Sequence, residues 1–465
     1  MILNRLTSVL QGDALKARAT RGALLTIANF GAAQFLRLAS NLILVRILFP
    51  EAFGLMALVQ VVITALEMFS VTGVNPSIVQ HKRGDEEAFL NTAWIVQIVR
   101  GLILWCFAFA LAAPAAEFYD QPMLAQLIPV AGLSAVIGGF QSTNVASANR
   151  HLRLAKLTFV EIFSQFTGIV VMILVAWITE SVWALLMSAL VTSGMKTLLS
   201  HVYLPGIRNR IQWDSAAFWD IFHYGKYIFI GSIAGFLIKT GDRAILGKFV
   251  TLTELAVYNF GYFLATVPVM LSNAVGVKVL LPIYSRLSGT TKAHDIRQRT
   301  RARGVLVLGM LGFSIFSSLI GVWLVQLLYS PEYYLAGPIM VLIAIAYMPA
   351  IIIHSYGLRL LGEGNSRDMT VHSVAQAIVQ TLILLVGVQY FGLMGAIVST
   401  PLAVAIIYPL LAWQVSKHNG WEPKLDILFV AVIACGLALT LWVNDTAIDQ
   451  VLQGAADESP AEVIR

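Results

Sequence analysis

The chain has 465 residues, of which 58% are hydrophobic and 12% are charged, and its formal net charge is +6. Soluble domains carry about 25% charged residues, so this composition excludes an ordinary soluble protein and predicts an all-α polytopic membrane protein. The basic residues lie mainly in short connectors between apolar runs, where membrane topology explains them, and we expect no nucleic-acid partner.

Apolar runs long enough to cross a bilayer, which takes about 20 residues, dominate the chain. Residues 1–21 precede them and alternate apolar with basic or polar positions, which predicts an amphipathic helix on the cytoplasmic leaflet. The runs predict thirteen spans, at 22–46, 52–75, 90–113, 123–146, 157–178, 181–204, 216–241, 252–276, 303–328, 333–357, 370–391, 394–415 and 426–443.

Basic residues occupy every second connector, and four of the opposite connectors, at 114–121, 179–181, 330–332 and 392–393, contain no Lys or Arg. The positive-inside rule therefore predicts a cytoplasmic N-terminus. The thirteenth span would leave the acidic tail outside.

Two segments of the chain resemble each other. A shift of 202 positions sets 37–48 on 239–250 and places the cations of one copy on cations of the other, and the connector 117–130 resembles 327–341 at a shift of about 210. We therefore expect two six-helix bundles related by an internal repeat, plus one extra C-terminal transmembrane helix. The predicted parts are an N-terminal bundle over 22–207, a linker at 208–215, a C-terminal bundle over 216–415, the additional helix 426–443 and a flexible tail at 444–465. Parallel repeats of this kind hold a substrate site between halves that alternate access to the two sides.

Cations inside the apolar runs are the candidate site. An Arg or Lys at the centre of a span costs at least about 2.5 to 3.5 kcal/mol, so such residues usually face a wet cavity or a partner. The candidate substrate-binding residues are Arg37, Arg100, Lys239 and Arg243, with Asn29 and Asn41 on the polar face of the first span. The acids at comparable depth are Glu67, Asp242 and Glu161. The excess of cations favours a ligand with more than one negative charge, such as a diphosphate.

Each candidate has a structural alternative. Arg37 and Arg100 either line a cavity or tie neighbouring helices together. Asp242 lies one turn from Lys239 and is placed to neutralise it locally. The three acids are either protonation sites for ion coupling or partners of arginines.

A family resemblance appears in four segments. They are GDRAILGKF (241–249), ELAVYNFGYFLATVP (254–268), NLILVRILFPEAFGLMAL (41–58) and ARATRGALLTIANFG (17–31). Over about the first 415 residues the chain resembles the polysaccharide transporter family, the Wzx-type oligosaccharide-lipid flippases, whose superfamily includes MATE exporters and MurJ lipid II flippases.

The resemblance implies a flippase of the bacterial inner membrane. It would move undecaprenyl-pyrophosphate-linked oligosaccharide to the periplasmic leaflet for the synthesis of O-antigen, capsule or exopolysaccharide. The implied partners are this lipid-linked oligosaccharide, membrane lipids, and the polysaccharide polymerase and export machinery, and we expect a monomer. The thirteenth span departs from a twelve-helix core and lacks embedded charge, so we expect it to be peripheral to transport.

Two other functions compete with this interpretation. A MATE-like small-molecule exporter coupled to cations would need a surplus of buried carboxylates, and the chain has a surplus of cations instead. A membrane polymerase or glycosyltransferase commonly displays a large external loop, and every external connector predicted here is short. The histidines and the two cysteines, Cys106 and Cys435, lack metal-ligand spacing, so we predict no catalytic residue, no metal and no cofactor.

Overall fold

The computed structural model describes residues 31–70, 73–289 and 292–449, apart from the side chains of 224–230. Within these ranges the chain forms helices and their connections, with no strand, and the all-α prediction is confirmed. Three predictions lie outside the described residues: the amphipathic N-terminal helix, Asn29, and the tail from residue 450 onward. The first part of the predicted flexible tail is described, and there the prediction is wrong, because 445–449 are helical and Ile448 is buried.

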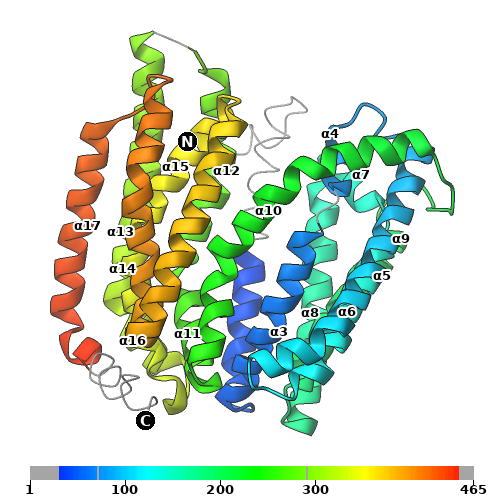
Figure 1. The fold of residues 1–465 in the computed structure, drawn as a ribbon, viewed down its shortest axis with the longest axis horizontal. Coiled ribbons are helices and arrows are strands. Elements are labelled where there is room, and N and C mark those ends of the chain that lie inside the picture. The colour runs from blue at the N-terminus through cyan, green and yellow to red at the C-terminus, as the bar shows by residue number, and fades with distance from the viewer. Residues whose placement is uncertain (1–30, 71–72, 290–291, 450–465) are drawn as a thin grey trace, which may run out of the picture. The chain divides into compact units, whose positions relative to one another are not determined.

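The chain packs as two units (Figure 1). The N-terminal unit holds the described residues up to Leu48 together with Val59–Ile233, and the C-terminal unit holds Phe49–Leu58 and the described residues from Ala234 onward. The division falls inside one long helix, α10, and therefore later in the chain than the linker expected at 208–215.

The N-terminal unit begins with a helix over 31–44. Its other helices are α3 (Pro50–Phe69), whose first half belongs to the C-terminal unit, α4 (Val74–Gln80), α5 (Glu87–Phe118), α6 (Leu124–Gly139), α7 (Asn144–Arg150), α8 (Leu154–Thr179), α9 (Trp183–Val202) and the first part of α10 (Ser215–Phe249).

The C-terminal unit contains the remainder of α10 and seven further α-helices. These are α11 (Leu252–Ala265), α12 (Val267–Arg286), α13 (Ala293–Leu328), α14 (Ala336–Ala346), α15 (Met348–Gly362), α16 (Ser366–Ser416) and α17 (Pro423–Val443), with the short 3-10 helix η1 (Pro331–Tyr333) before α14.

Among the described residues, eight helices are long and apolar enough to cross a membrane, or up to ten if two bent pairs each form one span. The sequence predicts thirteen spans, and part of the difference lies in α16. This helix covers the two predicted spans 370–391 and 394–415, which meet at Gly392 with φ of 51°. A Cβ at Gly395 would lie 1.9 Å from the carbonyl oxygen of Gly387, so the turn brings the two halves into backbone contact that only glycine allows.

The predicted span 252–276 differs from the structure in both its shape and its end. It is broken at Thr266 into α11 and α12, and α12 continues to Arg286. The break has a local cause, because Pro268 lacks an N–H group and its ring would clash with the carbonyl four residues earlier in a continuous helix.

The expected linker is bound to the N-terminal unit. The Asn91 side chain accepts from the backbone N–H of Arg210 at 3.0 Å, and the Thr92 hydroxyl accepts from that of Asp214 at 2.9 Å. The Asp214 carboxylate also accepts a hydrogen bond from Arg83 at 2.6 Å. Residues 208–214 are therefore an integral edge of this unit.

Helix α17, the predicted thirteenth span, is packed into the C-terminal unit beside α13 (Figure 1). Phe429 of α17 is fully buried in a core built with side chains of α13, α15 and α16. Further along, Gly436 lies against Ile315, and the Thr440 hydroxyl is 2.9 Å from that of Ser318. The helix contributes directly to the core.

A buried ionic network holds the first turn of α17. Arg303 of α13 is 1% exposed and donates to Asp426 at 2.6 Å and to Glu422 at 3.1 Å. Asp426, 5% exposed, also accepts from the hydroxyls of Tyr356 and Tyr408, each at 2.6 Å. The expectation that this helix lacks embedded charge is therefore wrong, because its first acidic residue neutralises a buried arginine. The expectation that it is peripheral to transport stays a prediction.

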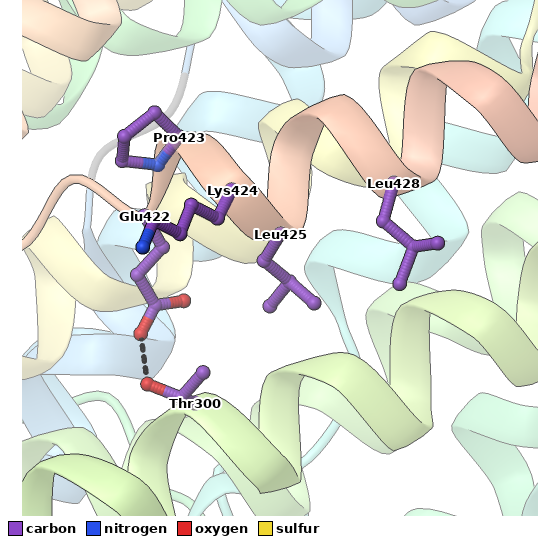
Figure 2. Close-up of a pocket in the computed structure, with 6 residues that line it drawn as sticks. All are labelled: Thr300, Glu422, Pro423, Lys424, Leu425 and Leu428. Carbon is purple, nitrogen blue, oxygen red and sulfur yellow. Dashed lines mark hydrogen bonds between the residues drawn. The ribbon is translucent and has the colours of Figure 1, made fainter.

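A hollow of about 450 Å³ adjoins this network between α13 and α17 (Figure 2). The Thr300 hydroxyl donates to Glu422, and this bond closes one side of the hollow. The remaining wall consists of Pro423, Leu425 and Leu428 with the stem of Lys424. A mainly aliphatic wall does not suit a diphosphate, so we do not place the substrate site here.

Candidate functional site

Arg37 and Asn41 lie one turn apart on the helix over 31–44. The Arg37 side chain is exposed and that of Asn41 is half-buried. One turn earlier, the Ala33 carbonyl accepts from the Gln165 amide of α8 at 3.1 Å. Ala33, Arg37 and Asn41 follow one another at one-turn spacing, and α8 contacts this row at Ala33. The Arg37 side chain remains accessible in this arrangement.

Arg100 of α5 holds the end of α3. Its Nε donates to the Ser70 carbonyl at 2.8 Å and to the Ser70 hydroxyl at 3.0 Å, while Nη2 donates to the Glu67 carbonyl at 3.0 Å. The last carbonyls of a helix lack hydrogen-bond donors within the helix and carry partial negative charge. A guanidinium at this end supplies the missing donors and balances the charge. Two of its three nitrogens are engaged in this way, which gives Arg100 the helix-tying role that the sequence left open.

The acids of the N-terminal unit have different surroundings. Glu67 is exposed and interacts electrostatically with Arg100. Glu161 of α8 lines a pocket of about 480 Å³ whose other walls come from α4 and α7, including Asn75 and Asn149. The structure thus does not bring these two acids into one cluster.

Asp242 and Arg243 of α10 both face α11. Asp242 is 3% exposed, and its Oδ2 accepts from the Tyr258 hydroxyl at 2.6 Å. The Arg243 guanidinium carbon lies 4.1 Å above the centre of the Tyr262 ring. Such a contact is worth about 2 kcal/mol when it is desolvated. Asp242 therefore has its partner on α11, and the Lys239 side chain is exposed.

Two histidines of the C-terminal unit, His354 and His372, were not identified from the sequence as site residues. His354 of α15 interacts electrostatically with Lys239 and with His372 of α16. A signal was present on α16, where His372 and Gln380 share a face at eight-residue spacing within an apolar span. Histidines scattered in sequence give no indication that two of them meet in space.

The connector 81–86 carries two close ion pairs of Arg83. Arg83 is bonded to Asp214, as described, and donates to Glu86 at 2.8 Å. These carboxylates raise the pKa of Arg83, and the hydrogen bond from Arg83 lowers the pKa of Asp214. Both groups stay charged at neutral pH, which keeps the connector and the segment 208–214 together.

Each unit has an arginine at the end of a bent helix pair. Helices α6 and α7 bend by 61°, and Arg150 at the end of α7 donates to three carbonyls at the end of α4, at 2.8 to 3.0 Å. The segments ending in α14 and α15 bend by 42°, and Arg359 donates to the Gly420 carbonyl at 2.8 Å and to Glu363 at 2.9 Å. This likeness within the two units supports the proposed duplication.

A sequence profile of a family described as "Polysaccharide biosynthesis protein" matches residues 43–337, which is more than half of the chain. The chain belongs to this family. The match includes three of the four site cations, Arg100, Lys239 and Arg243, and begins just after Asn41.

Two similar proteins act in the biosynthesis of different polymers by name. The lipopolysaccharide biosynthesis protein WzxC of Escherichia coli is 23% identical over 300 residues, which are 63% of this chain and 58% of WzxC. The teichuronic acid biosynthesis protein TuaB of Bacillus subtilis is 20% identical over 297 residues, 63% of this chain and 61% of TuaB. The chain thus matches about three-fifths of the length of each.

The fold is that of a known flippase. The lipid II flippase MurJ in an inward closed conformation superposes with a TM-score of 0.69 at 12% identity, over 95% of this chain and all of MurJ. The resemblance to the polysaccharide transporters, predicted from four short segments, is confirmed.

Proposed function

We propose that the chain is a flippase that moves an oligosaccharide linked to a lipid pyrophosphate across the membrane by alternating access. The main support is that this chain, a member of the polysaccharide biosynthesis family with a MurJ-like fold, has accessible cations inside its spans. Arg37 of the N-terminal unit and Lys239 of the C-terminal unit are both exposed although they lie in apolar helices. WzxC and TuaB are biosynthesis proteins by name, and we propose that this chain serves such a pathway as a transporter and not as an enzyme.

The four cations have two roles in this proposal. Arg37 and Lys239 contact the phosphate oxygens, to which arginine offers a planar fork and lysine a point charge. Arg100 and Arg243 add positive potential from fixed positions, because Arg100 is bonded to the end of α3 and Arg243 lies on Tyr262. Asn41 adds an amide one turn from Arg37 for hydroxyl groups of the sugar.

The charge of the ligand provides a driving force. A pyrophosphate diester carries about two negative charges, and its outward movement through a potential negative inside is favourable by about 2.3 kcal/mol per charge per 100 mV. The cost that remains is removal of the head group from water, which a preformed set of cations offsets. Glu67, Glu161 and Asp242 are the proposed sites for any coupled ion, and Asp242 would have to exchange its bond to Tyr258.

We propose a bacterial inner-membrane location with the N-terminus in the cytoplasm, from the alternation of basic connectors. A monomer working beside the polymerase and export machinery is the simplest arrangement. A membrane-impermeant thiol reagent tests the orientation in intact cells, because a cysteine at Asp120 should react and one at Arg297 should not.

The activity is tested with purified protein in vesicles that contain lipid-linked oligosaccharide from the host cell. A glycosidase that cannot cross the bilayer reports the fraction of sugar on the outer leaflet. Vesicles with the protein should expose all of the sugar, and vesicles without it about half. If both expose half, under a potential or an ion gradient as well as without one, the proposal fails.

A further inference from the structure

Helix α16 buries polar atoms that have no partner among the described residues. His372 is 4% exposed, and neither Nδ1 nor Nε2 has a hydrogen bond. Gln380, two turns further along the same face, uses its Nε2 to donate to the Ile238 carbonyl of α10 at 3.3 Å, while its Oε1 is buried and unpaired. An unpaired buried polar group costs about 1 to 3 kcal/mol. Such atoms on one face indicate a site for a polar ligand.

Basic side chains on the adjoining helices lie within electrostatic range of this face. Gln380 is bonded to Ile238, so the next residue, Lys239, lies at the same level of the unit. His354 of α15 interacts electrostatically with both Lys239 and His372. Three groups able to carry positive charge are thus contributed by three helices.

The described acids of α10, α15 and α16 within the C-terminal unit, including the residue that follows α15, are engaged elsewhere. Asp242 accepts from Tyr258, and Asp368, one turn before His372, lies 3.8 Å from the ring of His418. Glu363, directly after α15, is bonded to Arg359. Tyr347, which directly follows α14, accepts a hydrogen bond at its hydroxyl from Thr400 at 3.4 Å. The Arg243 guanidinium is stacked on the Tyr262 ring. A cation would find no available carboxylate, whereas an oxyanion would find several donors.

We propose that Lys239, His354, His372 and Gln380 form an oxyanion site within the C-terminal unit, which takes up protons from water when it binds phosphate oxygens. This inference rests on the proposed function and assigns the phosphate of the lipid-linked substrate to histidines as well as to Lys239. Without an anion, two charged imidazoles beside a lysine would repel one another. With an anion, each imidazole gains a proton and both of its nitrogens become donors.

Proton uptake makes the affinity depend on pH in a definite direction. Binding strengthens as pH falls, by up to about tenfold per pH unit for each proton taken up, because anion and proton favour each other's binding equally. Two histidines set the upper limit at two protons. A site of lysine and arginine alone would not bind more tightly at pH 6 than at pH 8, because those side chains remain charged while the terminal phosphate of the ligand, with a second pKa of about 6, begins to gain a proton.

The test is binding of farnesyl diphosphate to purified protein in lipid nanodiscs at pH 6 and pH 8. We expect wild type to bind at least tenfold more tightly at pH 6. The variants His354→Gln and His372→Gln should bind as wild type does at pH 8 and lose most of the gain at pH 6. Lys239→Gln should weaken binding at both pH values and retain the pH dependence. His294→Gln, an exposed histidine at the start of α13, is the control and should behave as wild type.

Two further probes identify the source of the phosphate. Inorganic pyrophosphate that competes equally well would assign the site to free phosphate, and a clear preference for farnesyl diphosphate would assign it to the lipid. The inference is wrong if wild type shows no pH dependence, or if both histidine variants, folded as judged by their thermal unfolding, keep it. Lipid-linked sugar that is still flipped in either case would show that the proposed function survives without this site.

Discussion

The most informative perturbation of the fold concerns the charge pair that anchors α17. Asp426→Asn keeps the shape of the side chain and an acceptor for the tyrosine hydroxyls but removes the charge facing Arg303, which is 2.6 Å away. Removing one partner of a buried ion pair costs about 3 to 5 kcal/mol. Glu422 stays 3.1 Å from the same guanidinium, so we expect the lower end of this range.

The double variant distinguishes a charge effect from lost packing. Arg303→Met leaves Asp426 without its cation and should cost about 3 to 5 kcal/mol by the same reasoning. In Arg303→Met/Asp426→Asn neither charge is left unpaired, so the cost should be smaller than the sum of the two by about 2 to 3 kcal/mol. The assay is reversible unfolding in mixed micelles, followed by tryptophan fluorescence.

The control pairs Arg303→Met with Asp445→Asn, an exposed residue beyond the far end of α17. These two changes should be additive within about 0.5 kcal/mol. If Asp426→Asn is equally additive with Arg303→Met, the network does not stabilise the unit as an ion pair. From the sequence, a chain that ends after Asn419 was expected to keep its export activity. Because this truncation removes both Glu422 and Asp426 and leaves Arg303 buried without a carboxylate, we now expect it to prevent stable folding.

Three other predictions concern the N-terminal unit. Arg37→Ala should abolish surface glycan export at matched membrane levels, whereas Arg46→Ala, in the turn after the same helix, should change it little; equal export from both would remove Arg37 from the site. Arg100→Lys should keep partial export and Arg100→Ala none, because lysine retains the charge but cannot bond both carbonyls of α3, so full export from the alanine variant would contradict the helix-tying role. The folded-state pKa of Asp214 is depressed by Arg83, so its stabilising bond is complete above the unfolded pKa of about 3.9 and is lost as pH falls through the lower folded value. Hydrogen exchange of 208–214, corrected for intrinsic rates, should therefore accelerate only below about pH 4 in wild type but already at pH 7 in Asp214→Asn, and identical curves would refute the tie.

The sequence predicted the helical class and most of the long helices, because an apolar run of 20 residues has few alternatives. It could not predict the partner of Arg303, since Asp426 is 123 positions away and both residues lie at the ends of apolar runs, where charges are expected. It could not predict the role of Arg100 either, because backbone carbonyls at the end of α3 leave no trace in residue identity. Asp242 shows the limit of helical spacing: Lys239 was in reach one turn away, yet Tyr258 on the next helix is the observed partner.

We propose that this chain moves a lipid-linked sugar by means of cations inside its spans. The most direct measurement is flipping of the host's lipid-linked oligosaccharide in vesicles containing wild type or Arg37→Ala/Lys239→Ala, both accessible cations. We expect complete exposure of the sugar to an external glycosidase with wild type and exposure of only half with the double variant. Equal, complete exposure with a correctly folded double variant would contradict it.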